Sequence, residues 1–495
     1  MNLQAELRGT KPLENPDAFR KVIWNYLKPR NGRPAPRAHL FTINGLTYPV
    51  HRDFSFAAVP DPHEVRDNRV VVQRSKRRYS MLAYLFSVRR GDLLFFFQAD
   101  PQGPGASILD RRGFRGIWVV ASEPFRDTTD IKLPSGYEVL GACPHCRSPF
   151  DFGEGSIVNG AKCSLCGNRY GEVNVSAGGS VRAFSRVVLS TRILIEPLVL
   201  FQRTAGDNRV YSDMTLPPLI WISRTDNAMG PGKGSSIRTL LPEEAAKVAY
   251  MLATEDGQRI IDGNRKQYPG LANPITDHNG VDAKYPRLRN AQEVEHELQL
   301  NLYFSRKIDD PGFSLTKDLE LPLERMEYWT TEFPWGYTGD TADFVAALWD
   351  DEKGRYKAYL FEFKKACIDK SALAETLLYI PWVAQVLLQF RPETPVLEVV
   401  PVMVGSSVGL RALPNAYSIC TSLFPSGRKT VNVLTPRVFV YTPVKMFKRG
   451  NCCYAQDLEF RETTLPRTSF SPPPPSFTTS AIERQWVIET YLSGF

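Results

Sequence analysis

The chain has 495 residues, of which 43% are hydrophobic and 23% charged, and this balance is typical of a soluble globular protein. Its length suggests about three or four domains, whose cores are large enough to make a disulfide framework unnecessary. The formal net charge of +8 favours negatively charged partners, nucleic acid first, although a basic balance alone does not establish one.

The ends and the apolar runs predict neither secretion nor membrane insertion. Residues 1–30 are polar and charged, so we expect no signal peptide. The longest apolar candidate, Ile193–Leu200, falls short of the roughly 18–20 residues that span a bilayer, and it contains Glu196. Cysteine usage without framework spacing favours a reducing compartment. We therefore expect a cytoplasmic, multidomain protein of α+β and α/β class.

Residues 1–37 are predicted to form a helical arm, and residues 38–130 a compact domain rich in strands. In the segment GDLLFFFQ at 91–98 a strand is predicted after Gly-Asp, and in GFRGIWVVASEPF at 113–125 a later strand is predicted to begin at Phe-x-Gly. This pattern resembles the PUA-like superfamily of small β-barrels, especially its EVE and YTH branches. The resemblance implies an aromatic pocket that holds a modified or flipped base. Candidate pocket residues are Phe54, Phe56 and Trp118, although each is also a reasonable core aromatic.

Basic residues cluster within the same domain. Such runs are often only solvated surface, and contact with nucleic-acid phosphates is the competing interpretation. The candidate phosphate-binding residues are Arg74, Lys76, Arg77, Arg78, Arg111, Arg112 and Arg115, with Arg66 and Arg69 just upstream.

Residues 131–178 contain two CxxC pairs, Cys143–Cys146 and Cys163–Cys166, separated by sixteen residues. Two such knuckles supply four thiolates, the tetrahedral donor set that suits Zn²⁺, and leave no open position for catalysis. A redox dithiol and chance are the alternatives. The module resembles a zinc ribbon, so we expect a structural Zn²⁺.

Residues 179–284 contain a helix that starts near Pro242 with two acids in its first turn, but their role is open, and they are treated as a connector. We place the next domain at 285–405. Residues 406–495 form a C-terminal extension that includes Pro472–Pro475 and a short helix at 481–492.

The segment Asp343–Lys365 has the pattern of a β-hairpin around a turn at Asp350–Arg355. If Trp349 pairs with Tyr356, then Asp343 lies opposite Glu362, and Lys364 falls on the same face of the sheet. The middle of that face is apolar, being formed by Val345, Ala347, Ala358 and Leu360.

Two neighbouring carboxylates in an apolar setting are costly unless a cation joins them. Hard oxygen ligands suit Mg²⁺ or Mn²⁺, which would polarise a phosphoryl oxygen and activate a water. Lys364 would orient that water or stabilise charge in the transition state. An ordinary hairpin with charges at a solvated end is the alternative for this short pattern.

The segment Lys370–Phe390 is largely apolar and is predicted to be helical, with a kink or break at Pro381. If the helix continues, Glu375, Tyr379 and Trp382 share one stripe. Strand–turn–strand–helix with D…ExK and then a polar-x3-Tyr pair resembles the PD-(D/E)XK nucleases, especially the RecB-like and NucS mismatch-endonuclease branches. We therefore expect a restriction-endonuclease-like α/β core.

The resemblance implies that Asp343 and Glu362 bind metal and that Lys364 is catalytic. Those families usually carry Gln-x3-Tyr on the helix, where this chain has Glu375 and Tyr379. They also have an active-site glutamate on an upstream helix. Glu295 adjoins the apolar face there and is the candidate, while Glu293 and Glu297 stay open.

The combination predicts a Mg²⁺-dependent endonuclease that cuts DNA in modification-dependent restriction, phage defence or repair. The alternative is a nucleic-acid-binding protein with an inactive nuclease fold. The sequence leaves open whether RNA is a substrate and whether the protein is a homodimer. A GxxxxGK[ST] phosphate loop is missing from the sequence, so we expect no ATP hydrolysis.

Overall fold

The computed structural model divides the chain into two compact units, residues 1–27 with 36–285 and residues 28–35 with 286–495. Each unit is described by itself. The residues that the structure describes are 3–28, 35–44, 47–58, 63–66, 69–72, 85, 88–100, 112–127, 129–132, 138–140, 157–158, 162–163, 186–189, 191–206, 209, 237–262, 266–270, 327–334, 341–350, 353–391, 394–423, 427–449, 452–472 and 480–492.

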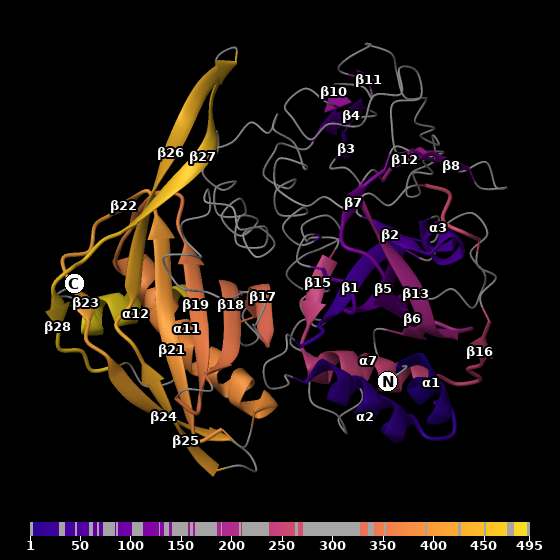
Figure 1. The fold of residues 1–495 in the computed structure, drawn as a ribbon, viewed down its shortest axis with the longest axis horizontal. Helices are drawn as coiled ribbons and strands as arrows, with labels where there is room; N and C mark the ends of the chain where they lie inside the picture. Colours follow the sequence, from indigo (N-terminus) through magenta and orange to yellow (C-terminus); the bar gives the residue numbers. More distant parts are fainter. Residues whose placement is uncertain are drawn as a thin grey trace. The chain divides into compact units, whose positions relative to one another are not determined.

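The N-terminal unit is built on a mixed sheet that curls into half a barrel (Figure 1). Along its main path the strands are β15 (Ile237–Leu240), β1 (Ala38–Asn44), β5 (Leu93–Asp100), β6 (Gly113–Val120), β13 (Thr191–Phe201) and β16 (Ile260–Ile261). Three short strands join it at the side, β14 (Ala205–Gly206), β2 (Phe56–Ala58) and β7 (Phe125–Arg126). Strands β1 and β5 pair in parallel, whereas the other pairs along this path are antiparallel. The strands predicted within 91–98 and 113–125 are β5 and β6, the central pair of the path.

Smaller sheets of the same unit lie outside this main sheet. They are formed by β12 (Arg186–Val188), β9 (Glu138–Leu140) and β8 (Ile131–Lys132), by β3 (His63–Arg66) and β4 (Arg69–Val72), and by β10 (Ile157–Val158) and β11 (Lys162–Cys163). The β10–β11 pairing sets Ile157 opposite Cys163. Of the four predicted zinc ligands, only the backbone of Cys163 is therefore described.

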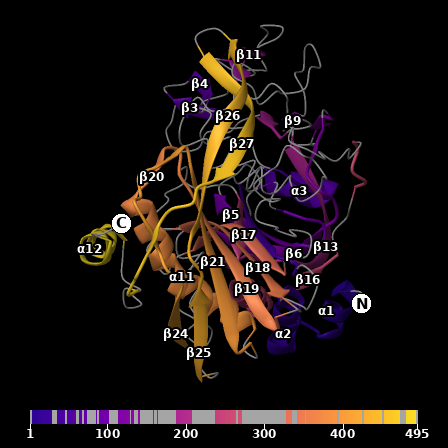
Figure 2. The same ribbon diagram turned by 60° about the vertical axis from the view of Figure 1, so that its left-hand side comes forward.

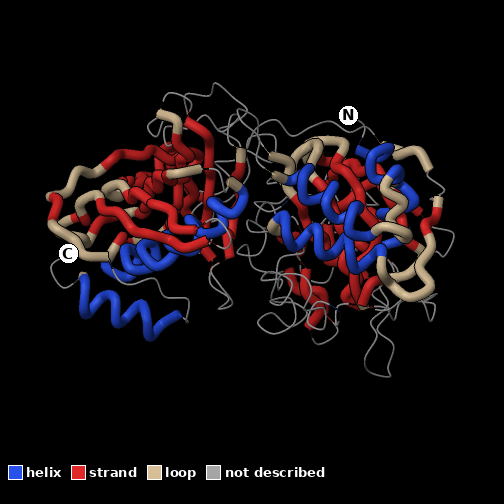
Figure 3. The backbone as a smooth tube through the Cα atoms, turned by 90° about the horizontal axis from the view of Figure 1, so that it is seen from below, coloured by secondary structure: helices blue, strands red, loops and turns tan. Residues whose placement is uncertain are grey.

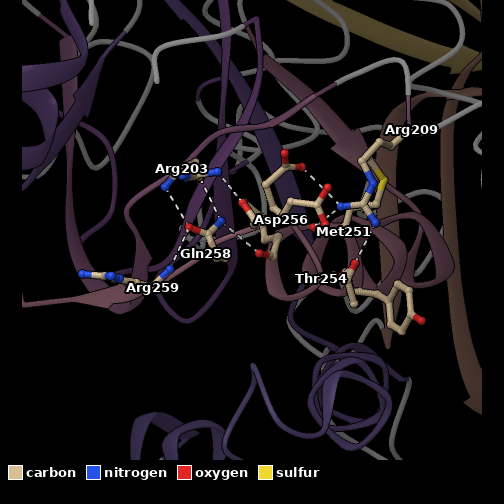
Figure 4. Close-up of polar contacts among 10 residues, drawn as sticks. Arg203, Arg209, Met251, Thr254, Asp256, Gln258 and Arg259 are labelled. Carbon is tan, nitrogen blue, oxygen red and sulfur yellow. Dashed lines mark hydrogen bonds and ion pairs between the residues drawn. The ribbon is translucent and has the colours of Figure 1, made fainter. Parts of the chain in front are cut away.

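The helices of this unit are α1 (Leu3–Gly9), α2 (Pro16–Leu27), α3 (Thr47–Phe54) and α7 (Pro242–Ala253). Helix α7 starts at the predicted proline, and the Leu241 N–H donates to Glu244 Oε2 at 3.0 Å. At its C-terminal end the Arg209 guanidinium donates to Met251 O at 2.9 Å and to Thr254 Oγ1 at 2.7 Å (Figure 4). A cation bonded to the last carbonyls suits the negative end of the helix dipole.

The described parts of residues 179–284 belong to the N-terminal sheet and its helices rather than to a separate connector. Strand β13 pairs with β2, β6, β7 and β16, and β15 pairs with β1, so this stretch completes the N-terminal sheet. Helix α7 packs on α2, which places the predicted helical arm against the same unit. Pairing between strands so far apart in sequence leaves no local pattern, and the sequence therefore did not predict it.

The C-terminal unit contains a second mixed sheet, seen from another side in Figure 2. Its main path is β17 (Tyr328–Pro334), β18 (Thr341–Asp350), β19 (Arg355–Phe363), β21 (Val396–Gly405), β25 (Gly427–Val433) and β24 (Tyr417–Leu423). Strand β26 (Arg437–Arg449) joins the other end of β21 and pairs with β27 (Cys452–Glu462). The expected C-terminal extension is thus part of this sheet rather than an appendage.

Two pairs of short strands and two helices complete the described part of this unit. They are β20 (Cys367–Ile368) with β22 (Ser407–Val408), β23 (Leu413–Pro414) with β28 (Arg467–Thr468), α11 (Lys370–Phe390) and α12 (Ser480–Tyr491). Helix α11 connects the parallel strands β19 and β21, and α12 lies alongside it (Figure 3). The short helix predicted at the C-terminal end is present as α12.

A kink or a break was predicted at Pro381; the break is wrong, because α11 runs through this residue as one helix of 21 residues, and the kink stays a prediction. Contacts with β19, β21 and β24 along its length offset the hydrogen bond that proline removes. The segment Lys370–Leu388 has the length and the mean hydropathy, 1.4, of a membrane-crossing helix, but 72% of its most apolar window is buried within the protein. The expectation that no apolar run approaches spanning length is corrected accordingly.

Candidate active site

The hairpin formed by β18 and β19 has the predicted register. Trp349 pairs with Tyr356, and Phe344 pairs with Phe361 at the other end. Gly354 in the turn has a φ of +56°, which a residue without Cβ adopts at little cost. Continuing this register by one residue sets Asp343 across from Glu362.

The two faces of this hairpin differ in chemistry. One face belongs to a large apolar cluster that includes Phe344, Phe361 and Phe363. The opposite face has the predicted apolar middle, whose members Val345, Ala347, Ala358 and Leu360 are all fully buried. Because side chains alternate along a strand, Asp343 and Glu362 belong to this second face. The two carboxylates therefore lie at the end of a buried apolar face of the hairpin.

Lys364 connects two carboxylates at this end of the sheet. Its Nζ donates to Glu362 Oε1 at 2.6 Å and to Glu375 Oε2 at 2.5 Å. The Phe363 N–H donates to Asp343 Oδ2 at 2.6 Å, which fixes that carboxylate beside the others. Asp343, Glu362, Lys364 and Glu375 thus form one charged cluster from two strands and a helix.

Burial of this cluster shifts its proton equilibria. Glu362 is only 4% exposed, and this burial, together with Asp343 and Glu375, raises the pKa of its carboxyl well above the usual value, against the opposing effect of Lys364. Burial alone would lower the pKa of Lys364, but Glu362, Glu375 and Asp343 raise it. The lysine is therefore a firmly charged ammonium, and negative charge exceeds positive charge around Glu362.

One oxygen of Glu362 is left over in this arrangement. Its Oε2 is buried, and none of the described residues donates a hydrogen bond to it. A buried carboxylate oxygen without a donor is rare and costly. Within the described part of the chain, no three His, Cys, Asp or Glu side chains are grouped to hold a metal ion. Two carboxylates are nevertheless enough for Mg²⁺, which keeps several waters, so Asp343 and Glu362 fit such an ion.

Helix α11 places Glu375 against Lys364. The helix starts where Asp369 Oδ1 accepts hydrogen bonds from the N–H groups of Ser371 and Ala372, at 3.0 and 3.1 Å, which satisfies its first turn. Glu375 is one turn further on and 9% exposed. Tyr379 follows one turn later in the same helix and is also buried, at 5% exposed.

Several predicted site residues lie outside the described residues. They are the glutamates Glu293, Glu295 and Glu297, the zinc ligands Cys143, Cys146 and Cys166, and the basic residues Arg74, Lys76, Arg77, Arg78 and Arg111. Their assignments stay predictions.

Arg115 differs from the expected surface position. It is 7% exposed, its Nε donates to Gln98 Oε1 at 2.6 Å, and its guanidinium lies 4.5 Å from the centre of the Tyr48 ring. The alternation of β6 turns this arginine inward, where it is bound and stacked. Arg112, just before the strand, is half-buried and lies over the Phe97 ring.

The three aromatic residues proposed for a base pocket are all in the core. Phe54, Phe56 and Trp118 are 9%, 0% and 1% exposed. Trp118 packs against Phe96, with ring centres 4.7 Å apart, whereas the two phenylalanines belong to another apolar cluster. Their described contacts are those of packing, and the base pocket stays a prediction.

A second buried charge cluster was not predicted. Asp92, 2% exposed, accepts from Arg37 N at 2.9 Å, Arg37 Nη2 at 3.1 Å and Arg89 N at 2.9 Å, and His39 Nε2 lies 2.8 Å away. The other ring nitrogen, Nδ1, is 3.3 Å from Thr239 Oγ1. Burial would raise the pKa of Asp92, but Arg37 and His39 lower it to about 2. The only local signal was the Gly-Asp pair before β5.

Comparison of the chain with known protein-family models finds no match. Comparison with curated proteins finds no related sequence either.

Proposed function

We propose that this chain is a metal-dependent nuclease that hydrolyses DNA phosphodiester bonds at Asp343, Glu362 and Lys364. The observation that carries the proposal is the buried Oε2 of Glu362, which receives no hydrogen bond from the described residues. The Asp343 carboxylate beside Glu362 adds further negative charge. A cation at this oxygen would relieve both the unmet hydrogen-bonding capacity and the repulsion. The surplus of negative charge is therefore what a metal site requires before the cation binds.

Asp343 and Glu362 would hold Mg²⁺ or Mn²⁺, which when bound supplies Lewis-acid polarisation of a phosphoryl oxygen and an activated water. The ammonium of Lys364 stabilises the negative charge that develops on the phosphoryl oxygens. Glu375 positions that ammonium from the helix, at 2.5 Å. The Phe363 N–H keeps the Asp343 carboxylate oriented before substrate arrives.

Nicking of supercoiled plasmid by purified protein, with and without Mg²⁺, tests this proposal. We expect nicking that requires the metal and is lost in Glu362→Gln. Glu398→Gln is the matched control, because Glu398 is also a buried glutamate of this sheet, 3% exposed, but is paired with Arg355 at the opposite end of the hairpin. Equal nicking by wild type and Glu362→Gln would show that this cluster is not the active site.

A nucleic-acid-binding protein with an inactive nuclease fold is the second candidate, and one observation favours it. Lys364 already contacts both Glu362 and Glu375, so the cluster is partly neutralised without any added ion. DNA binding without nicking, in Mg²⁺ and in Mn²⁺, would establish this alternative.

For the N-terminal unit we propose base reading by a PUA-like domain and a structural zinc ribbon, which would direct cutting to modified DNA in restriction, phage defence or repair. The curled sheet supports the first part in outline only. Nicking assays on methylated, hydroxymethylated and unmodified DNA, and on RNA, test the preference. Metal analysis should give about one Zn per chain if the four cysteines form one site.

A further inference from the structure

The hairpin formed by β26 and β27 starts at the edge of the sheet that carries the charged cluster. Strand β21 is parallel to both β19 and β26, with Glu362 beside Met403 and Met403 beside Val438. Two strand spacings separate Glu362 from Val438, about 10 Å. Beyond this level β26 continues in the direction in which β19 runs from Glu362 to Lys364.

The base of the hairpin is tied to the residues that follow the cluster. The Tyr441 hydroxyl donates to Lys365 O at 2.6 Å, one residue after Lys364. Tyr441 and its strand partner Phe460 belong to the apolar cluster on the other face of the sheet. The hairpin is therefore anchored next to the candidate active site.

Beyond Tyr441 the hairpin leaves the sheet. The pairing of β21 with β26 ends at Gly405 and Val440, and within the described part of the chain β27 pairs with β26 alone. Figures 1 and 2 show this two-stranded ribbon, in yellow, extending past the other strands. Pairing continues to Arg449 and Cys452, so the nine residues after Val440 reach roughly 30 Å beyond the sheet.

The sequence of this free ribbon is basic and carries aromatic residues. Residues 443–458 contain Lys445, Lys448 and Arg449 against a single acid, Asp457. The register of β26 and β27 makes Phe447 and Tyr454 strand partners. The ribbon thus combines three cations and two aromatic residues in its sequence, and only two residues separate its strands along the chain.

We propose that the β26–β27 hairpin is a DNA-binding arm that contacts phosphates of the duplex beside the cleavage site. A two-stranded ribbon fits the major groove, which is about 12 Å wide, and its three cations complement the phosphates that flank the groove. This inference rests on the proposed nuclease function, because it takes the scissile strand to lie at Glu362. It adds that this arm, some 80 residues after the catalytic hairpin in sequence, supplies backbone affinity.

The experiment measures binding of a fluorescent 30-base-pair duplex across a salt series, without added divalent cation. The test variant combines Lys445→Glu, Lys448→Glu and Arg449→Glu. The control reverses three basic residues at the opposite end of the same sheet, Lys353 in the turn between β18 and β19 and Arg428 and Lys429 in β25, each to Glu. A shortened chain that joins Pro443 to Leu458 through Asn-Gly is the second variant, because these two residues are strand partners and only self-paired ribbon is removed.

For the arm variant we expect a loss of affinity of about 10- to 100-fold and a salt slope that is flatter by about 2 to 3, since each phosphate contact contributes about 0.9. The shortened chain should bind as weakly, whereas the control should stay within about twofold of wild type if its charges are remote from the duplex. Thermal unfolding of each variant verifies that it is folded.

If both arm variants bind DNA with the affinity and the salt dependence of the wild type, the proposal of a DNA-binding arm is wrong. A wild type that binds no duplex, or an arm that governs only single-stranded or RNA binding, would also overturn it. If the arm variants change the oligomeric state and leave DNA affinity intact, the arm contacts a second copy instead and the proposal is wrong. Arm-dependent binding without any nicking would contradict the nuclease function and leave the arm standing, so the two failures are distinguishable.

Discussion

Asp92 and Glu362 are two buried carboxylates whose surroundings differ. Asp92 accepts hydrogen bonds from the Arg37 guanidinium and the Arg89 N–H, and it contacts His39. Arg37 and His39 hold its pKa at about 2 despite burial. Glu362 has one ammonium on one oxygen, two carboxylates nearby and an oxygen that accepts nothing from the described residues. The first carboxylate is a finished structural element, whereas the second is short of positive charge. Both acids are buried, so what distinguishes the structural acid from the candidate catalytic one is the number of hydrogen-bond donors and cations around it.

The largest difference should appear in catalysis. We expect Asp343→Ala, Glu362→Ala and Lys364→Ala each to lower DNA cleavage by about 10³-fold or more, because each removes a metal ligand or a charge used in the transition state. Asp92→Asn should leave the rate per folded molecule unchanged, and Glu375→Ala should cost less than the other three. Single-turnover nicking at saturating protein measures these rates. A comparable loss in Asp92→Asn would show that the effect is not specific to the cluster around Glu362.

Stability should show the opposite order. Asp92→Ala leaves the buried Arg37 guanidinium without its carboxylate, and we expect unfolding to become easier by about 3–5 kcal/mol. Glu362→Gln removes a carboxylate that burial and like charges already disfavour, so the free energy of unfolding should fall by less than about 1 kcal/mol or rise. Urea unfolding followed by circular dichroism decides between them. Equal destabilisation would mean that Glu362 is as structural as Asp92.

Acid should weaken the Asp92 cluster specifically. The folded pKa is about 2 against an ordinary 3.8, so this carboxylate stabilises the folded state above pH 4, and the contribution is lost as the pH falls toward 2. The shift corresponds to stabilisation on the order of 2 kcal/mol. Unfolding free energies of wild type and Asp92→Asn should therefore converge between about pH 4 and pH 2. A constant gap over that range would contradict the assigned pairing.

The smallest effect should come from metal binding without substrate. If Asp343 and Glu362 bind Mg²⁺ with a dissociation constant of about 1 mM, about 10 mM Mg²⁺ stabilises the folded chain by about 1.4 kcal/mol. The melting temperature of the C-terminal unit should then rise by about 3–6 °C, and Glu362→Gln should show no rise. An identical rise in both proteins would place the ion elsewhere.

Local patterns were sufficient to predict the hairpin that carries the candidate active site. Trp349 and Tyr356 flank a turn with glycine, and alternation then assigns the strand residues on either side of the turn to the two faces of the sheet. The contact between Glu375 and Lys364 needed the helix to pack on that hairpin, which periodicity suggested but did not fix. The register therefore gave the acids and the lysine, and tertiary packing gave the fourth member of the cluster.

Long-range packing explains the errors. Pro381 reads as a helix breaker, yet α11 continues because it is held against three strands. Arg115 reads as part of a basic surface run, yet alternation and the Tyr48 ring turn it into the core. The Arg37–Asp92–His39 cluster depends on β1 and β5 pairing in parallel, for which residues near Asp92 give no signal beyond a glycine turn.

The pairing of β1 with β15 bears on how the chain is made. His39 and Thr239 are neighbours in the sheet although 200 residues separate them. At about 5–20 residues per second of translation, β1 waits roughly 10–40 s for this edge partner to leave the ribosome. During that interval an apolar strand edge is open to pairing with other nascent chains. Expression at lower temperature or with a holdase chaperone should therefore raise the soluble yield, and chains that stop before β15 should aggregate.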